Sequence, residues 1–510
     1  MRLEQYKVNE VLRFPTDGMT GRIKIKTSVR AITKENVREV LEKALALHAV
    51  NAAQITYLYE YYKGNQDVRF KQKYVRENIN NKVTVNRANE IVTFKSAYRL
   101  NEPILYTNVG GDDGISKSVG QLNEYMRMED KESKDKEIVD WTHICGVADR
   151  FVLTDELAGV QDGAPYYIYT LDPRDAFVIY SARIGERPMA GVIIQQDENE
   201  ELFCMVYTED RCFTVKRDGE VTEEMHILGG IPLVEYINNE ARMGAFETVI
   251  PILNAINDLE SNALDAIQDY VNGFDVFQNC DIDDDKYGEL SIGGKAVRVK
   301  TVVQGREAKV YRIATELSQQ GVQQRVDDMT EAYLTICGMP NRNGGSSTSD
   351  TGQAVIFRDG WSEAESRAKD SEKLFTRSER QFLRIVLNIC AVKAPLNLEL
   401  KDIGINYARK SLNNLQSRFQ CFMEGLASDR LNPKCVFDAF GDIFGDKNEA
   451  YNMSMAWRRE QEEKAEKALE EELDRERERI AGNGDTGNTG GVPSGGQGNP
   501  KPEQADPEEA

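Results

Sequence analysis

A β-strand is predicted to end and a long helix to begin across the stretch Leu228-Gly-Gly-Ile-Pro-Leu-Val-Glu-Tyr-Ile-Asn-Asn239, followed by Met243-Gly-Ala-Phe-Glu-Thr-Val-Ile250. Pro232 suits the start of an edge strand, and the Asn-Asn pair favours a turn after it. After Gly244, apolar residues recur at helical spacing to about Gly273. The stretch therefore separates a β region from a helical region.

The β region is predicted to cover residues 150–236, because apolar and polar residues alternate there between turn signals. Asp218-Gly219 lies between two such runs and is a hairpin signal. We expect a mostly antiparallel arrangement. The clearest runs are Tyr166–Thr170, Phe177–Tyr180, Ala190–Ile194 and Leu202–Tyr207.

Helices are predicted before this region over residues 34–62 and 86–98, and a helical zone is predicted over roughly 116–148. Thr33 is a suitable N-cap for the first of them. Four tyrosines near the end of that helix are predicted to pack in a core or an interface rather than to bind a ligand. They are Tyr57, Tyr59, Tyr61 and Tyr62.

Two helices with a small β segment between them are predicted after residue 245. The apolar spacing predicts a helix from Ala245 to about Val271, with acidic residues on its other faces. A second helix is predicted over 315–337. Between them, Leu290–Ile313 alternates around two glycine-containing turn signals. The fold class is therefore α+β.

The rest of the chain is predicted to be mainly helical. A loop of small polar residues at 341–352 precedes a long helix over 361–392. Short helices are predicted over 411–445, and one long charged helix over 447–480. The final segment, 481–510, is rich in Gly, Asn, Pro and acidic residues, which is typical of disordered chain.

The charge limits the classes of function. The 510 residues carry a formal net charge of −21. This sign argues against tight binding of nucleic acid over a wide surface, because such binding depends on Lys and Arg neutralising phosphates. An acidic wall would instead keep DNA from adhering to the inside of a conduit. A soluble protein of any other function can also be acidic, so charge alone leaves both interpretations open.

The sequence contains no motif of comparable strength for catalysis. It lacks the glycine-rich phosphate loops of ATPases and dinucleotide-binding enzymes, and it lacks Gly-x-Ser-x-Gly. The three histidines are isolated, and the eight cysteines form no Cys-x-x-Cys. Asp281–Gly288 resembles a calcium loop, but Lys286 and Ile292 stand where glycine and glutamate are required. We expect no enzyme activity, no cofactor and no metal ion.

The sequence also predicts no membrane attachment. The N-terminus lacks a hydrophobic signal core, and no apolar run approaches the length of a membrane span. The expected compartment is the cytoplasm.

A basic cluster interrupts the acidic chain between residues 295 and 312, where the single acid is Glu307. It is a candidate contact for DNA phosphates or for an acidic partner. The alternative, an ordinary solvated hairpin face, stays open. The cluster comprises Lys295, Arg298, Lys300, Arg306, Lys309 and Arg312.

The polar loop after residue 340 has two interpretations as well. It could be a flexible linker between helices, or its small side chains could enter a narrow passage and move with the cargo. Arginines on both sides could contact phosphates. The candidate DNA-facing residues are Arg342, Asn343, Ser346, Ser347, Thr348, Ser349 and Arg358.

The opening stretch resembles the portal proteins of tailed bacteriophages when it is taken with Tyr61-Tyr-Lys-Gly-Asn-Gln66 and Asn78-Ile-Asn-Asn-Lys-Val-Thr-Val-Asn86. The best-known member of that family comes from a Bacillus siphophage, and the similarity runs from about residue 50 to 450. It implies a subunit with an α/β wing, a two-helix stem, a small β-containing clip and a helical crown. Carried onto this chain, the parts are the wing (1–247), the stem helices (248–274 and 315–340), the clip (275–314), the tunnel loop (341–358), the long wing–crown helix (359–399), the crown (400–480) and a disordered tail (481–510).

The resemblance implies a dodecameric ring at the capsid vertex, through which the genome is packaged and ejected. It further implies virion localisation after assembly in the host cytoplasm. The implied partners are double-stranded DNA, the terminase large subunit, the head–tail adaptor, and the major capsid and scaffolding proteins. Two alternatives remain: a structural ring of the tail or baseplate that conducts no DNA, and a hydrolase that uses dispersed carboxylates.

Overall fold

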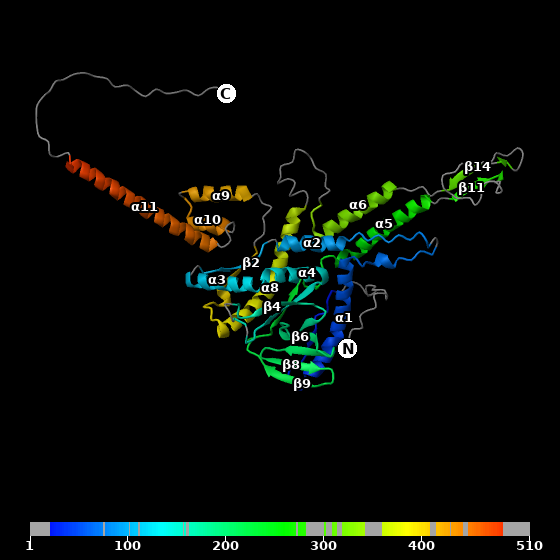
Figure 1. The fold of residues 1–510 in the computed structure, drawn as a ribbon, viewed down its shortest axis with the longest axis horizontal. Coiled ribbons are helices and arrows are strands. Elements are labelled where there is room, and N and C mark those ends of the chain that lie inside the picture. Colours follow the sequence, from blue (N-terminus) through cyan, green and yellow to red (C-terminus); the bar gives the residue numbers. More distant parts are fainter. Residues whose placement is uncertain are drawn as a thin grey trace, which may run out of the picture. The chain divides into compact units, whose positions relative to one another are not determined.

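A computed structural model of the chain describes residues 21–74, 77–100, 102–110, 113–156, 158–159, 163–271, 274–281, 300–301, 309–313, 319–341, 360–407, 415–428, 430–441 and 447–482. The chain divides after Asn432 into two compact units. Helices and strands are mixed throughout the first unit (Figure 1), so the α+β class is confirmed.

The largest sheet of the first unit has six strands in the order β1-β5-β6-β7-β8-β9. Neighbouring strands are antiparallel except for the short pair β1 and β5. Side chains alternate between the two faces, so Phe177 and Ile179 pack against the start of helix α1 while Ala176 and Val178 join the core on the other side. The bounds are β1 Lys26–Thr27, β5 Ala176–Ser181, β6 Pro188–Gln196, β7 Leu202–Tyr207, β8 Arg211–Lys216, β9 Val221–Met225 and α1 Val37–Lys63.

A three-stranded sheet, β10-β3-β4, packs on the other face of the six-stranded sheet through Phe151 and Leu233. Its own far side is covered by helices α3, α4 and α8 and by the two-stranded sheet of β2 and β15, which share one apolar core. The bounds are β2 Ile104–Asn108, α3 Asp113–Met128, α4 Lys131–Cys145, β3 Val147–Leu153, β4 Tyr167–Leu171, β10 Leu233–Ile237, α8 Trp361–Lys393 and β15 Ile403–Tyr407.

A third core joins the second half of α1 to helices α2, α5 and α6. The chain leaves α5, forms the antiparallel strand pairs β11–β14 and β12–β13, and returns along α6 (Figure 1). The bounds are α2 Arg87–Arg99, α5 Ile250–Val271, β11 Phe274–Gln278, β12 Cys280–Asp281, β13 Lys300–Thr301, β14 Lys309–Ile313 and α6 Gln319–Cys337, with 3-10 turns at Asp67–Phe70, Glu247–Val249 and Leu400–Asp402.

The described part of the chain ends with three more helices. Helix α9, Leu415–Ala427, belongs to the first unit. In the second unit, α10, Pro433–Phe440, packs on α11, Lys447–Gly482, with the Phe437 and Tyr451 rings edge to face at 5.7 Å. Helix α11 is exposed from Ala456 to Glu478, in keeping with its charged sequence.

Most of the predicted elements are confirmed. The strands expected over 150–236 are present, and Asp218-Gly219 turns between β8 and β9 with φ of 95° at the glycine. The predicted helices over 86–98, 245–271, 315–337, 361–392 and 447–480 are α2, α5, α6, α8 and α11, and the short helices over 411–445 are α9 and α10. Tyr57 and Tyr61 are buried in the third core, as predicted.

One prediction was wrong in detail. Thr33 does not cap α1, because the helix begins later, at Val37; Asn36 occupies the N-cap and makes no capping hydrogen bond to the helix. The helical zone predicted over roughly 116–148 is confirmed, and it consists of two helices. Asp130 adopts a left-handed conformation with φ of 49°, which ends α3 before α4, and β3 already begins at Val147.

Three predictions fall largely outside the described residues. These are the β segment over Leu290–Ile313, of which the structure describes β13 and β14, the acidic loop Asp281–Gly288, and the disordered tail over 481–510.

Candidate functional site

Helix α5 carries a stripe of polar side chains that holds the connection between α1 and α2. Asn257, Ser261 and Asp265 are spaced four residues apart, so they lie on one face of the helix. Their oxygens accept hydrogen bonds from the backbone N–H groups of residues 85, 83 and 81, at 2.8, 3.0 and 2.7 Å. One helical turn of four residues rises about 6 Å, and two residues of extended chain span nearly the same distance. The matched spacing allows alternate backbone N–H groups of the segment 81–85 to bond to successive polar side chains of α5.

The two short motifs that carried the family resemblance meet at this stripe. The Asn257 amide donates to the Gln66 side chain at 2.6 Å, and Gln66 donates to Asn86 at 3.0 Å. The Tyr61 hydroxyl donates to Asn254 at 2.8 Å. Tyr61, Gln66 and Asn86 are therefore joined through a largely buried polar network to the first half of α5.

Asp265 anchors the other end of the stripe. Its side chain is 4% exposed and lies 3.0 Å from Lys71 and 3.4 Å from Lys73. Burial by itself would raise the pKa of Asp265, but the hydrogen bonds from Asn81 and the ion pair with Lys71 outweigh it and lower that pKa. The carboxylate thus fixes the loop at 71–81 on α5 while it stays ionised.

Helices α5 and α6 pack side by side, with Leu253, Ile256, Tyr333 and Cys337 in the same core. Their outer surface is acidic. Helix α5 contains no Lys or Arg, and Asp258 is exposed on it. On α6, three acids are exposed beside a single cation: Asp327, Asp328, Glu331 and Arg325.

The insertion between α5 and α6 is closed at its base by paired strands. Phe274 faces Ile313 and Gln278 faces Lys309 in the ladder of β11 with β14. Three residues of the basic cluster fall on these strands: Lys300 opposite Asp281, Lys309 opposite Gln278, and Arg312 opposite Asp275. Lys309 is exposed. The remaining members, Lys295, Arg298 and Arg306, lie outside the described residues.

A second excursion leaves the other end of the helix pair. The described chain stops at Asn341 and resumes at Gly360, and a methyl group at Gly360 would lie 3.8 Å from Cα of Pro340. Arg367 ties the two sides together, because its guanidinium donates to the carbonyl of Ile336 at 2.7 Å. The segment 342–359 therefore starts and ends at one place. All of the candidate residues of the polar loop lie in it, outside the described residues: Arg342, Asn343, Ser346, Ser347, Thr348, Ser349 and Arg358.

The helix that follows this excursion is anchored by a buried cluster of charges. Arg150 on β3 and Glu379 on α8 are both fully buried and lie 3.3 Å apart. Arg150 also pairs with Asp135, and Lys131 pairs with Asp135 at 2.6 Å and with Glu379 at 2.8 Å. Two tyrosine hydroxyls donate to the Glu379 carboxylate, Tyr106 at 2.5 Å and Tyr236 at 2.7 Å.

The charge balance of this cluster keeps Glu379 ionised. Burial alone would raise its pKa, but Lys131 and Arg150 lower that pKa below the ordinary range. The sequence analysis missed the cluster. Glu379 lies between Phe375 and Phe382 on the apolar face of its helix. A single acid on an apolar face was the feature of the sequence that could have revealed the cluster.

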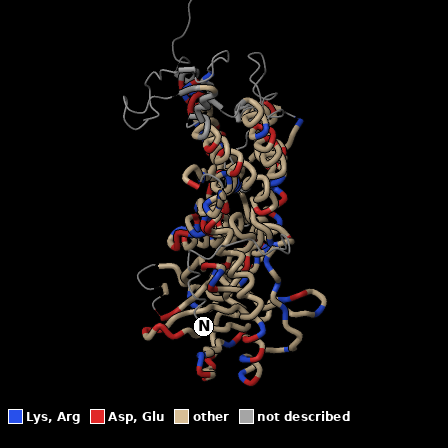
Figure 2. The backbone as a smooth tube through the Cα atoms, turned by 90° about the vertical axis from the view of Figure 1, so that its right-hand side faces the viewer, with Lys and Arg blue, Asp and Glu red and all other residues tan. Residues whose placement is uncertain are grey.

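A groove of about 1700 Å³ lies between the six-stranded sheet, β10 and α8. Acidic and basic residues are interspersed along much of the chain (Figure 2), but nine cationic side chains line this groove against five acidic ones. Four of those acids already have a partner: Asp210 lies 3.5 Å from Arg211, and the other three form the following pairs. Glu186 pairs with Lys24 and Lys26, which lower its pKa to about 2, Glu235 pairs with Arg242, and Glu240 pairs with Arg377.

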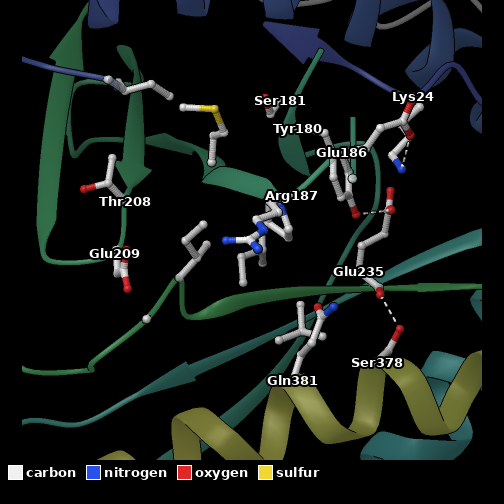
Figure 3. Close-up of a pocket in the computed structure, with 18 of the residues that line it drawn as sticks. Lys24, Tyr180, Ser181, Glu186, Arg187, Thr208, Glu209, Glu235, Ser378 and Gln381 are labelled. Carbon is white, nitrogen blue, oxygen red and sulfur yellow. Dashed lines mark hydrogen bonds and ion pairs between the residues drawn. The ribbon is translucent and has the colours of Figure 1, made fainter. Parts of the chain in front are cut away.

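Four arginines of the groove have no ion-pair partner among the residues that the structure describes. Figure 3 shows Arg187 in the middle of the groove, near Glu235, which accepts a hydrogen bond from Tyr180 at 2.6 Å. The sequence analysis missed this surface, because its side chains come from segments far apart in the chain. The four are Arg30, Arg183, Arg187 and Arg384.

Other kinds of site are not found in the described part of the chain. No group of three or more His, Cys, Asp or Glu side chains there could hold a metal ion. Within the same residues, no helix has the length and apolar character needed to cross a bilayer.

Comparison with known proteins places the chain in a family. The family model described as phage portal protein, SPP1 Gp6-like, matches residues 41–438. A comparison with curated proteins finds no match. One solved structure that the structural comparison matches is titled "Neck of empty GTA particle computed with C6 symmetry"; it is 8% identical, with 69% of this chain and 89% of that chain covered and a TM-score of 0.37. The family match spans most of the chain, and this protein therefore belongs to the SPP1 Gp6-like phage portal proteins, structural components of the head–tail connector at the capsid vertex of the virion.

Proposed function

We propose that twelve copies of this chain form a ring that conducts double-stranded DNA into the capsid during packaging and out of it during ejection. One observation carries the proposal: α5 and α6 form a pair with an acidic outer surface, and a closed excursion leaves each end of the pair. With 22 residues in α5, the two excursions are separated by roughly 30 Å along the helices.

The acidic surface suits a wall that DNA must pass without adhering. Phosphates are repelled by carboxylates, so a wall with few cations leaves the duplex free to slide. On this proposal α5 and α6 are the stem (248–274 and 315–340). The excursion at 341–358 is the tunnel loop, and its candidate residues from Arg342 to Arg358 approach the duplex.

The insertion at 275–314 is proposed as the clip. There it would meet the terminase large subunit during packaging and the head–tail adaptor afterwards. Its basic cluster, from Lys295 to Arg312, offers charge for an acidic partner or for DNA. The wing (1–247), the wing–crown helix (359–399) and the crown (400–480) would contact the major capsid and scaffolding proteins, with assembly in the host cytoplasm.

End-on electron microscopy of the purified full chain tests the ring. Twelve-fold class averages with a central hole of about 20 Å or more, wide enough for B-form duplex, are expected. Monomers or closed dimers over a range of salt and protein concentration would contradict the proposal. Rings without such a hole would favour a structural ring of the tail or baseplate.

Binding to the terminase large subunit tests the clip. The variant Lys300→Glu/Lys309→Glu/Arg312→Glu is expected to form rings and to bind terminase at least tenfold more weakly. The control, Lys117→Glu/Lys369→Glu/Lys373→Glu, makes the same change of charge in α3 and α8, away from the insertion. Equal binding by the two variants would remove the basic cluster from the proposed contact.

A further inference from the structure

We propose that the arginine groove receives an acidic hairpin of the neighbouring copy, the turn 197–201 between β6 and β7. The contact would be one head-to-tail interface of the ring, so the inference rests on the proposed ring. It commits to a second copy of this chain as the occupant of the groove.

The basic side is built on the hairpin between β5 and β6. Arg183 and Arg187 are exposed on it, and Ile184 at its tip is fully exposed. Arg30 and Arg384 complete the set of unpaired guanidinium groups. Unpaired arginines next to a bare apolar side chain are typical of a surface that another protein covers, because Arg and large apolar groups are enriched at such contacts.

The acidic side is preformed. Asp197 folds the turn, because its carboxylate accepts hydrogen bonds from the backbone N–H groups of Asn199 at 2.9 Å and Glu201 at 2.8 Å. Glu198, Glu200 and Glu201 are exposed, and none has an ion-pair partner among the described residues. The segment 197–201 contains four acids and no Lys or Arg. It thus presents three exposed carboxylates on a hydrogen-bonded turn.

The two hairpins lie at opposite ends of the same strand. Pro188 of β6 pairs with Tyr180 at the arginine end, and Gln196 pairs with Leu202 at the glutamate end. The nine residues of β6 span about 30 Å, which exceeds the Debye length of about 10 Å at 0.1 M salt. The arginines at one end of β6 and the glutamates at the other end are therefore too far apart to neutralise each other within one chain.

In a ring, the cationic patch of one copy can contact the anionic patch of the next copy. Rings arise from interfaces that join two different patches of the subunit, one on each side. A cationic patch at one end of a sheet and an anionic patch at the other end meet this requirement. Carboxylates can also bind guanidinium groups in pairs with defined geometry, which fixes the orientation of the contact.

The same features argue against DNA as the occupant. No residue that lines the groove comes from α5, from α6 or from either excursion. A phosphate backbone lying along the groove would also meet the carboxylate of Glu209, whereas a short hairpin can direct its few carboxylates to the arginines.

Charge reversal in the full-length chain tests the inference. Arg183→Glu/Arg187→Glu and Glu198→Arg/Glu201→Arg are each expected to raise at least tenfold the protein concentration at which half of the chain is in rings. The combined variant restores opposite charges and is expected to return that concentration to within about threefold of the wild type. Light scattering measures the mass, and electron microscopy confirms the rings.

The control is Glu132→Arg/Glu137→Arg, which makes the same change of charge as Glu198→Arg/Glu201→Arg at two exposed positions of α4. It is expected to assemble as the wild type does, and all variants should melt within a few degrees of it. Normal assembly of both single-end variants, or failure of the combined variant to recover, would overturn the inference and leave the ring intact. Normal assembly together with weaker duplex binding by Arg183→Glu/Arg187→Glu would instead make the groove a DNA contact. A wild-type chain that forms no rings would contradict the proposed function itself.

Discussion

At the scale of single residues, Glu379 shows how an ionised group can be tolerated in a core. Its carboxylate contacts Lys131, Arg150, Tyr106 and Tyr236, so little of its hydrogen-bonding capacity is unused. Replacing one partner of such a cluster is costly, because the remaining charges stay buried without compensation. The cluster therefore couples α8 to β3 and α4 through charge as well as through apolar packing.

Glu379→Gln is expected to lower the free energy of unfolding by about 3–5 kcal/mol, because Lys131 and Arg150 lose their shared anion. Urea unfolding of the purified chain measures the change. The control Arg380→Gln alters the exposed neighbour and should stay within about 0.5 kcal/mol of the wild type. A loss below about 1 kcal/mol for Glu379→Gln would show that the cluster is not a connected unit.

The pKa of Asp149 is shifted in the opposite direction to that of Glu379. It is 2% exposed, and one of its carboxylate oxygens has no hydrogen-bond partner. Burial, followed by the repulsion of Glu235, raises the pKa of Asp149 well above the ordinary value. The folded chain therefore binds this proton more tightly than the unfolded chain does, and stability is lost as pH rises above about 4.

The direction of the Asp149 pKa shift can be tested directly. Asp149→Asn is expected to raise the melting temperature at pH 7 and to leave it nearly unchanged at pH 4, where the carboxyl of the wild type is protonated. Glu379→Gln should show the reverse trend: its pKa is lowered in the fold, so its contribution is complete above about pH 4.3 and fades as the pH falls below that value. Melting curves of Asp149→Asn between pH 4 and 8, and of Glu379→Gln between about pH 2 and 6, check the two trends. A pH-independent difference for Asp149→Asn would contradict the assignment.

At the scale of elements, the long helices and the strands of the β region could be predicted from periodicity, since α5 and α8 each bury one continuous apolar stripe. The break at Asp130 could not, because it depends on one residue that adopts a left-handed conformation. The polar stripe of α5 was hidden for another reason. Asn257 and Ser261 appear as ordinary polar residues until the extended segment at 81–85 lies against them.

Removing one acceptor of that stripe tests its role. Ser261→Ala leaves the N–H of Val83 without a partner, which is expected to lower the free energy of unfolding by about 1–3 kcal/mol. Hydrogen exchange should show faster exchange at Val83, with a smaller effect at Val85. Asn262→Ala, at the exposed next position, is the control. Unchanged protection at Val83 would mean that water replaces the hydroxyl at no cost.

At the scale of the whole molecule, the candidate site was only partly accessible from sequence. The basic cluster and the polar loop were recognisable as local composition, but the groove joins segments around residues 22–33, 180–189, 208–211, 229–242 and 377–385. No local pattern reports such a convergence. The acidic character of the chain, in contrast, was visible at once, and the three acids of α6 all lie at exposed positions.

That acidity leads to the last prediction. The variant Asp327→Lys/Asp328→Lys/Glu331→Lys replaces three exposed acids of α6 with cations. If these residues face passing DNA, the variant rings should bind a short duplex at least tenfold more tightly than wild-type rings at 50 mM salt. Most of that gain should disappear by about 200 mM, because each new phosphate contact adds to the salt dependence. The control, Glu462→Lys/Glu466→Lys/Glu470→Lys, makes the same change of charge on exposed α11. Equal gains for the two variants would mean that only the total charge matters, whereas a gain confined to α6 would identify its acids as the surface that keeps the duplex free to move.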